Sequence, residues 1–97
     1  MNSQTPNSQR PVTIYTRGWC GYCSAAKALL AKKGVSFDEI DIEAVSGARG
    51  EMIDRAMGRT SVPQIFIGET HVGGYDDISA LERRGQLDAL LDSGQPS

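Results

Sequence analysis

The apolar residues of the chain fall into short runs whose spacing is typical of alternating strands and helices. Residues 12–16 are rich in β-branched and aromatic side chains and are followed by Gly18, which predicts a buried strand. Residues 35–42 alternate apolar and polar positions, with a shift of phase near Asp38. This alternation predicts a second strand that runs into a loop.

Between and after these strands, apolar residues recur at helical spacing. A first helix is predicted from Cys23 to just before Gly34, because its face repeats at i, i+3, i+4 and i+7, in residues Ala26, Leu29, Leu30 and Lys33. A second helix is predicted between Gly47 and Gly58, with an inward face made of Met52, Ile53, Ala56 and Met57.

The C-terminal third of the chain has the pattern of a hairpin followed by a helix. Residues 62–67, a Gly68-Glu69 turn and residues 70–72 predict two short strands in a tight hairpin. Asp76 and Asp77 mark the start of a third helix, since negative charge complements the helix dipole, and Gly85 ends it. Three leucines in residues 87–91 predict a last helical turn.

The order β-α-β-α-β-β-α predicts an α/β domain in which helices cover a small mixed sheet. A chain of 97 residues is long enough for one such domain, and we assign it to residues 11–92. Residues 1–10 are polar and residues 93–97 follow the last leucines, so we expect a disordered N-terminal tail and a short C-terminal tail.

Charge and hydropathy narrow the range of partners. The net charge is −2, and charged residues of both signs are interspersed, so we expect no nucleic-acid partner. The N-terminal residues lack the apolar region of a signal peptide, and no run approaches the roughly 18 apolar residues that cross a bilayer. We therefore expect a cytoplasmic protein without a membrane partner.

The two cysteines of the chain, Cys20 and Cys23, lie where the first strand gives way to the first helix. A disulfide that closes so short a loop stabilises a fold by only ~2 kcal/mol on the chain-entropy model. Zinc would need two more ligands, and the chain offers only His71, which we expect at the surface of its strand. A CxxC pair within a βαβ pattern is instead typical of thioredoxin-like redox sites.

The position of each cysteine predicts its role. Cys20 should lie at the helix N-terminus, where backbone N–H groups stabilise a thiolate, with Arg17 close by. We expect Cys20 to be the nucleophile. Cys23, one turn into the helix, should be more buried and should resolve a mixed disulfide formed at Cys20.

Three segments of the chain resemble the signature regions of the glutaredoxin family. They are Ile14-Tyr15-Thr16-Arg17 through Cys20-Gly21-Tyr22-Cys23, then Thr60-Ser61-Val62-Pro63-Gln64-Ile65-Phe66-Ile67, and then Gly73-Gly74-Tyr75-Asp76-Asp77. In length and order the chain is most similar to the small bacterial dithiol members of the glutaredoxin 3 type. The resemblance implies a thioredoxin fold with a four-stranded sheet and a glutathione-dependent thiol-disulfide oxidoreductase.

The resemblance also implies a glutathione site. Val62-Pro63 matches a cis-proline position whose preceding backbone pairs with glutathione, and Ser61 lies beside it. Free N–H groups at Gly74, Tyr75 and Asp76 would bind the γ-glutamyl carboxylate, and the Asp76 side chain would accept from the ammonium group. Arg17 stands where the family usually has Lys and would face the glycine carboxylate, while Tyr22 would line the groove.

The sequence does not decide the roles of three further residues. Arg59 is either a further cation for a glutathione carboxylate or a solvated side chain. Trp19, directly before Cys20, is unusual for the family and either docks substrates or caps the groove. Most dithiol members have Pro where this chain has Gly21, and Gly adds an N–H and backbone freedom there.

The small residue Gly21 is also compatible with a second function. Some members with a small residue at this position hold a [2Fe-2S] cluster between two subunits, through the first cysteine of each and two glutathiones, so Cys20 would be the ligand here. We expect instead a monomer that acts on glutathionylated or disulfide-containing proteins, ribonucleotide reductase among the candidates. A third alternative is a thioredoxin-like donor reduced by a flavin reductase, which would have no need of a glutathione groove.

Overall fold

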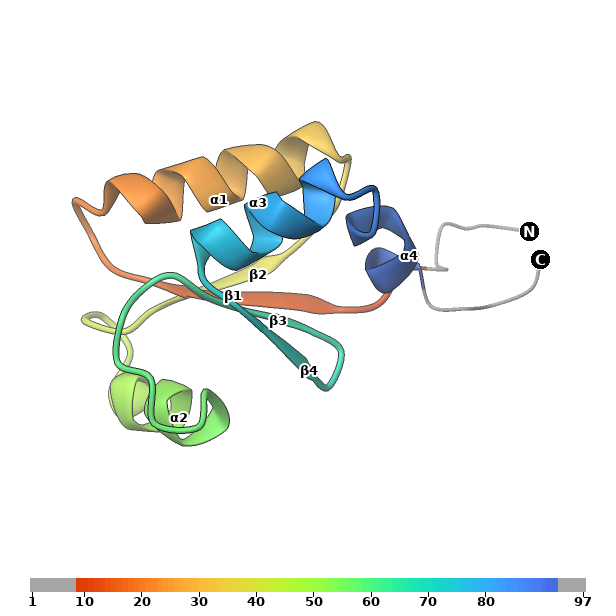
Figure 1. The fold of residues 1–97 in the computed structure, drawn as a ribbon. Coiled ribbons are helices and arrows are strands. Elements are labelled where there is room, and N and C mark those ends of the chain that lie inside the picture. Colours follow the sequence, from red (N-terminus) through yellow and green to blue (C-terminus); the bar gives the residue numbers. More distant parts are fainter. Residues whose placement is uncertain (1–8, 93–97) are drawn as a thin grey trace, which may run out of the picture.

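The computed structural model describes residues 9–92 and contains four strands and four helices within them (Figure 1). In chain order these are β1 Val12–Thr16, α1 Gly21–Lys32, β2 Asp38–Asp41, α2 Ala48–Arg55, β3 Gln64–Ile67, β4 Thr70–Gly73, α3 Tyr75–Arg83 and α4 Leu87–Leu91. The strand order is β2-β1-β3-β4. β2 runs parallel to β1, and β3 runs antiparallel to both β1 and β4. This mixed four-stranded sheet confirms the predicted fold class.

Helices cover both faces of the sheet. Figure 1 shows α1 and α3 together on one face and α2 on the other. The larger core lies under α1, α3 and α4 and consists of the buried residues Val12, Ile14, Ala26, Leu30, Ile65, Ile67, Ile78, Leu87 and Leu91. The smaller core lies under α2 and consists of Tyr15, Met52, Ala56 and Phe66. Successive residues of β1 and β3 thus enter opposite cores, as strand geometry requires.

Polar contacts attach α2 to the smaller core. The Tyr15 hydroxyl donates to the Glu51 carboxylate and accepts from Arg55 Nη1 at 2.9 Å. The Arg55 guanidinium also lies 4.2 Å from the centre of the Phe66 ring, a distance at which a cation is attracted to an aromatic face. These contacts hold α2 against β1 and β3.

Two predicted strands are shorter in the structure than the apolar pattern indicates. Pairing with β1 extends only over Asp38–Asp41, and Val35 and Phe37 pack against the larger core from the connection before β2. β3 begins at Gln64, after a cis Val62–Pro63 peptide bond. Proline has no N–H for a ladder, so residues 62 and 63 lie outside the strand.

The ends of the described chain lie side by side. Gln9 and Asp92 form an antiparallel bridge, and the Arg10 N–H donates to the Leu91 carbonyl at 2.8 Å. Gln9 and Arg10, which the sequence places in the tail, are therefore attached to the end of α4. The rest of the expected tails, residues 1–8 and 93–97, lies outside the described residues. No helix within residues 9–92 is long and apolar enough to cross a membrane.

Candidate active site

Cys20 lies at the N-cap of α1, directly after the loop that leaves β1. Its Sγ accepts a hydrogen bond from the Cys23 backbone N–H at 3.2 Å and lies 3.9 Å from the Val62 carbonyl oxygen. The side chain is partly exposed, and the cysteine is free. Cys20 is therefore accessible at the start of a helix, where the sequence predicts the nucleophile.

Cys23 lies one turn into α1 and has a different environment. Its side chain is 2% exposed, and the residue belongs to the buried face of the helix. Burial, with a smaller contribution from the hydrogen bond to Cys20, raises the pKa of the Cys23 thiol to about 11. Cys23 thus keeps its proton at neutral pH, as a resolving thiol beside an accessible one would.

A cavity of about 200 Å³ opens between α1, the segment before β3 and the start of α3. The Tyr22 and Tyr75 rings stack across it, with centroids 6.0 Å apart and planes at 25°. All but one of the residues expected to bind glutathione come together here, in a lining of Tyr22, Arg59, Ser61, Val62, Pro63, Gly74, Tyr75, Asp76 and Asp77. The exception is Arg17.

Asp77 organises one end of this cavity, a role that the sequence analysis missed. Its Oδ2 accepts from the Gly74 N–H at 2.8 Å and from Arg59 Nη1 at 3.4 Å. Gly73 has a φ of 114°, and a Cβ there would collide with the Asp77 carboxylate. The expectation of a free N–H at Gly74 was therefore wrong, because Asp77 already occupies it. The first-turn donors of Tyr75 and Asp76 remain, since such N–H groups have no partner within a helix.

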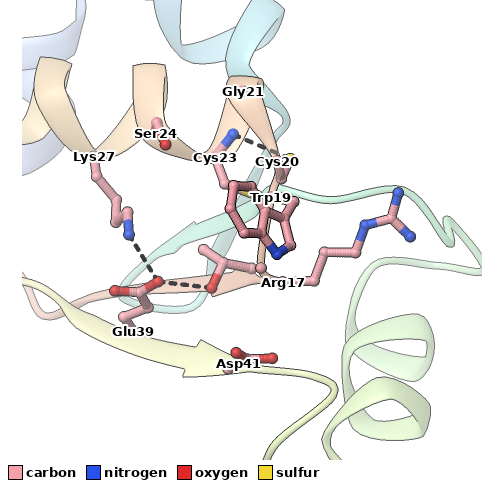
Figure 2. Close-up of a pocket in the computed structure, with 11 residues that line it drawn as sticks. Arg17, Trp19, Cys20, Gly21, Cys23, Ser24, Lys27, Glu39 and Asp41 are labelled. Carbon is pink, nitrogen blue, oxygen red and sulfur yellow. Dashed lines mark hydrogen bonds and ion pairs between the residues drawn. The ribbon is translucent and has the colours of Figure 1, made fainter.

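Arg17 lines a neighbouring cavity of about 370 Å³, which shares Tyr22, Ser61 and Val62 with the first and also contacts Cys20. Figure 2 shows the Arg17 side chain pointing away from Lys27 and Glu39. A second cation, Arg49 of α2, lines the same cavity. Arg49 was not among the predicted site residues. It is an exposed residue of α2, and the sequence pattern did not indicate that the fold brings it near Cys20.

The chain matches known proteins over most of its length. A model of the glutaredoxin family matches residues 12–72. A glutaredoxin of Pseudomonas aeruginosa is 59% identical over 81 residues, which are 84% of this chain and 95% of the relative. Glutaredoxin 3 of Escherichia coli K12 is 58% identical over 80 residues, which are 82% and 95% of the two chains. The chain belongs to the glutaredoxin family.

Solved glutaredoxin structures share its fold. The Brucella melitensis glutaredoxin superposes with a TM-score of 0.78 at 54% identity, over 95% of this chain and 99% of that one. A buckwheat glutaredoxin in complex with glutathione superposes with a TM-score of 0.77 at 29% identity, over 84% and 76% of the two chains. The chain therefore has the thioredoxin fold of thiol oxidoreductases in this family.

A third cavity of this glutaredoxin, about 470 Å³, reaches both cysteines from the β2 side (Figure 2). Glu39 accepts from Lys27 Nζ at 3.0 Å and from Thr16 Oγ1 at 2.8 Å. The hydrogen bonds from Lys27 and then from Thr16 lower the pKa of the Glu39 carboxyl. Cys20 thus lines this cavity, which the Lys27–Glu39 ion pair also borders, and the cavity of about 370 Å³ that contains Arg17.

The remaining candidates have distinct surroundings. Trp19 is fully exposed, with a φ of 59°, and lines two of the cavities that contact Cys20. His71, expected at the surface of its strand, is half-buried against Phe66, with ring centroids 4.9 Å apart. Within residues 9–92, no three His, Cys, Asp or Glu side chains are grouped as metal ligands would be.

Proposed function

We propose that this chain is a glutathione-dependent oxidoreductase that reduces glutathione mixed disulfides and protein disulfides. The observation that carries the proposal is a continuous lining from Cys20 past Val62 to the stacked Tyr22 and Tyr75 rings and Asp76. A tripeptide with two carboxylates and one ammonium group needs cations, helix N–H donors and an extended backbone to pair with. The two joined cavities offer each of these.

Each part of glutathione has a complementary partner in this lining. The backbone of Val62 pairs with the glutathione cysteine and brings its sulfur to Cys20, 3.9 Å from the Val62 oxygen. The N–H groups of Tyr75 and Asp76 bind the γ-glutamyl carboxylate, and the Asp76 carboxylate accepts from the ammonium group.

The glycine end of glutathione has its own partners. Its carboxylate lies between Arg17 and Arg49, which line one cavity. The ring of Tyr22 covers the tripeptide between its two ends, over a groove whose remaining lining is Ser61, Pro63 and Gly74.

The monothiol reaction proceeds in two exchanges. The Cys20 thiolate attacks the glutathione sulfur of a mixed disulfide. The S–S bond of the substrate breaks, the substrate thiolate leaves and takes a proton from water, and a Cys20–glutathione disulfide forms. A second glutathione thiolate then attacks the glutathione sulfur on Cys20, which releases glutathione disulfide and restores the Cys20 thiolate.

Protein disulfides follow the dithiol route. Cys20 attacks one sulfur of the substrate disulfide and forms a mixed disulfide with it, while the other substrate sulfur leaves as a thiol. Cys23 then loses its proton and attacks Cys20, which releases the second substrate thiol and leaves a Cys20–Cys23 disulfide. Two glutathiones reduce this disulfide and leave as glutathione disulfide.

The test is a coupled assay in which glutathione and glutathione reductase reduce a small glutathione mixed disulfide in the presence of the chain. We expect NADPH consumption that depends on both the chain and glutathione. Thioredoxin reductase with NADPH, in place of glutathione and its reductase, is the control. Turnover with thioredoxin reductase but not with glutathione would favour the thioredoxin-like donor instead.

A [2Fe-2S] carrier is the second candidate. The favouring observation is the open space at Gly21, where a Cβ would meet no atom within 4 Å beyond its chain neighbours and its own helix backbone, beside the partly exposed Cys20. The donor set fits, because Cys20 and one glutathione from each of two chains supply the four thiolates that a cluster needs. Anaerobic incubation with iron, sulfide and glutathione tests it. A colourless monomer after this incubation would rule the carrier out.

A further inference from the structure

The segment that forms one wall of the glutathione groove is held from behind by a buried glutamine. Gln64 is fully buried on β3, and its Nε2 donates to the Ser61 carbonyl at 3.0 Å and to Ser61 Oγ at 3.2 Å. In the described part of the chain, the other hydrogen bond to residues 60–62 is the long contact between Cys20 Sγ and the Val62 oxygen. Gln64 is therefore the main polar anchor of this wall.

His71 fixes the orientation of the Gln64 amide. Its Nε2 lies 2.6 Å from Gln64 Oε1. Because the amide nitrogen must face the Ser61 carbonyl, which only accepts, the amide oxygen faces His71 and the imidazole donates through Nε2–H. The His71 ring is held in place by the Phe66 ring, whose plane lies at 24° to it.

The surroundings of His71 keep this donor in place. Burial, and then the nearby Arg59 charge, lower the pKa of His71, with Arg55 acting in the same direction and Asp77 opposing them. The ring is thus neutral at pH 7, with its proton on the nitrogen that faces Gln64. An imidazolium also carries a proton on Nε2, so the contact does not depend on the titration of His71.

We propose that His71 and Gln64 are positioning residues that hold Ser61, and through it the Val62 backbone, in the geometry that binds glutathione. The inference rests on the proposed function of the groove. Pro63 has no N–H to tie this segment to the sheet, so the glutamine amide takes the place of a ladder bond. Neither side chain lines the three cavities described above, and both act through Ser61.

The test compares steady-state kinetics of variants on a small glutathione mixed disulfide. His71→Phe keeps an aromatic ring on Phe66 but removes the donor, and His71→Gln returns an amide donor. For His71→Phe we expect KM to rise about fivefold, the effect of one net hydrogen bond, with kcat unchanged. His71→Gln should restore KM. Gln64→Met, which removes both contacts to Ser61, should raise KM at least as much.

Two controls separate positioning from folding and from thiol reactivity. Thr70→Phe introduces the same ring at an exposed position of β4, and its KM should equal that of the wild type. The rate at which iodoacetamide alkylates Cys20 should be the same in every variant, because this reagent does not use the groove. Thermal unfolding identifies any variant that has lost its fold.

The outcomes separate this inference from the proposed function. A wild-type chain that turns over the mixed disulfide, with KM unchanged in both His71→Phe and Gln64→Met, would overturn the inference alone. A KM in His71→Gln as high as in His71→Phe would also overturn it. A wild-type chain with no glutathione-dependent turnover would overturn the proposed function of the groove itself.

Discussion

The backbone N–H of Cys23 points at the sulfur of Cys20, 3.2 Å away, while the Cys23 side chain is itself buried. One turn of helix thus gives the two thiols opposite surroundings. Cys20 lies at the helix N-cap and lines two cavities, one of which adjoins the tyrosine-lined cavity at Val62. Cys23 faces the interior and keeps its proton.

This difference predicts unequal effects of removing each thiol. Cys20→Ser should abolish both reduction of mixed disulfides and reduction of protein disulfides, because both begin at its sulfur. Cys23→Ser should keep the reduction of a small glutathione mixed disulfide and lose most activity on a protein disulfide, which needs the second thiol. The glutathione-coupled assay with each substrate measures this, and comparable loss in both variants would contradict the assigned roles.

The buried Cys23 thiol predicts a loss of stability at alkaline pH in the reduced protein. Its pKa is raised from 9.0 to about 11 in the folded state, so between these values the folded chain binds more protons than the unfolded one. The free energy of unfolding therefore falls as pH rises through this range. Urea unfolding of the reduced chain between pH 8 and pH 11 measures the slope.

The control for this slope is Cys23→Ala, because other groups titrate in the same range. The pKa values of Tyr15 and Lys33 are also raised, the first mainly by burial and the second mainly by the hydrogen bond to Asp88. Both therefore contribute to the same alkaline loss in every variant. Cys23→Ala should show a shallower slope than the wild type, and equal slopes would show that Cys23 does not titrate differently on folding.

Replacing Asp76 should weaken substrate binding, whereas replacing the neighbouring Asp77 should destabilise the fold. Asp76 is exposed at the groove, so Asp76→Ala should raise KM for a glutathionylated substrate and change the free energy of unfolding by only a few tenths of a kcal/mol. Asp77 caps α3 through the Gly74 N–H, so Asp77→Ala should cost about 1 kcal/mol of stability. Urea unfolding and KM, measured on both variants, test the contrast. An unchanged KM in Asp76→Ala would refute its role in binding the ammonium group.

Local pattern predicted the elements of this fold, but tertiary contacts set where the strands begin and end. Alternation over residues 35–42 is a property of the chain itself, whereas the ladder of β2 exists only where Asp38–Asp41 lies beside β1. Val35 and Phe37 are apolar because they cover the core from the connection. A period-two pattern does not distinguish these two reasons for burial.

The site was predictable where its residues are adjacent in sequence and was missed where they are not. The cysteine pair and the segments around Val62 and Asp76 are short motifs, and the structure brings them together. The roles of Arg49, Gln64 and Asp77 also depend on other segments, because Arg49 shares a cavity with Cys20, Gln64 contacts His71, and Asp77 pairs with Arg59. Gln64 in particular lies in an apolar run, and its buried amide has meaning only once Ser61 and His71 are placed beside it.

Replacing Trp19 by glycine should stabilise the protein and impair its activity. It is fully exposed and has a φ of 59°, a left-handed conformation that costs a residue with a Cβ roughly 1–2 kcal/mol. Trp19→Gly relieves this strain but adds freedom to the unfolded chain, so we expect a net gain of about 0.5–1 kcal/mol. Since Trp19 lines the cavities beside Cys20, the same change should lower kcat/KM for a protein disulfide more than for a small one.

Met57 provides the matched control for that change. It is also exposed, with a φ of 57°, and it follows α2 without lining any cavity that contacts Cys20. Met57→Gly should raise the free energy of unfolding by a similar amount and leave both activities at the wild-type level, because it relieves the same strain away from the thiols. Urea unfolding measures the stability of both variants, and the glutathione-coupled assays with a small and a protein disulfide measure their activity. If Trp19→Gly gains stability and loses no activity on the protein disulfide, Trp19 does not dock substrates.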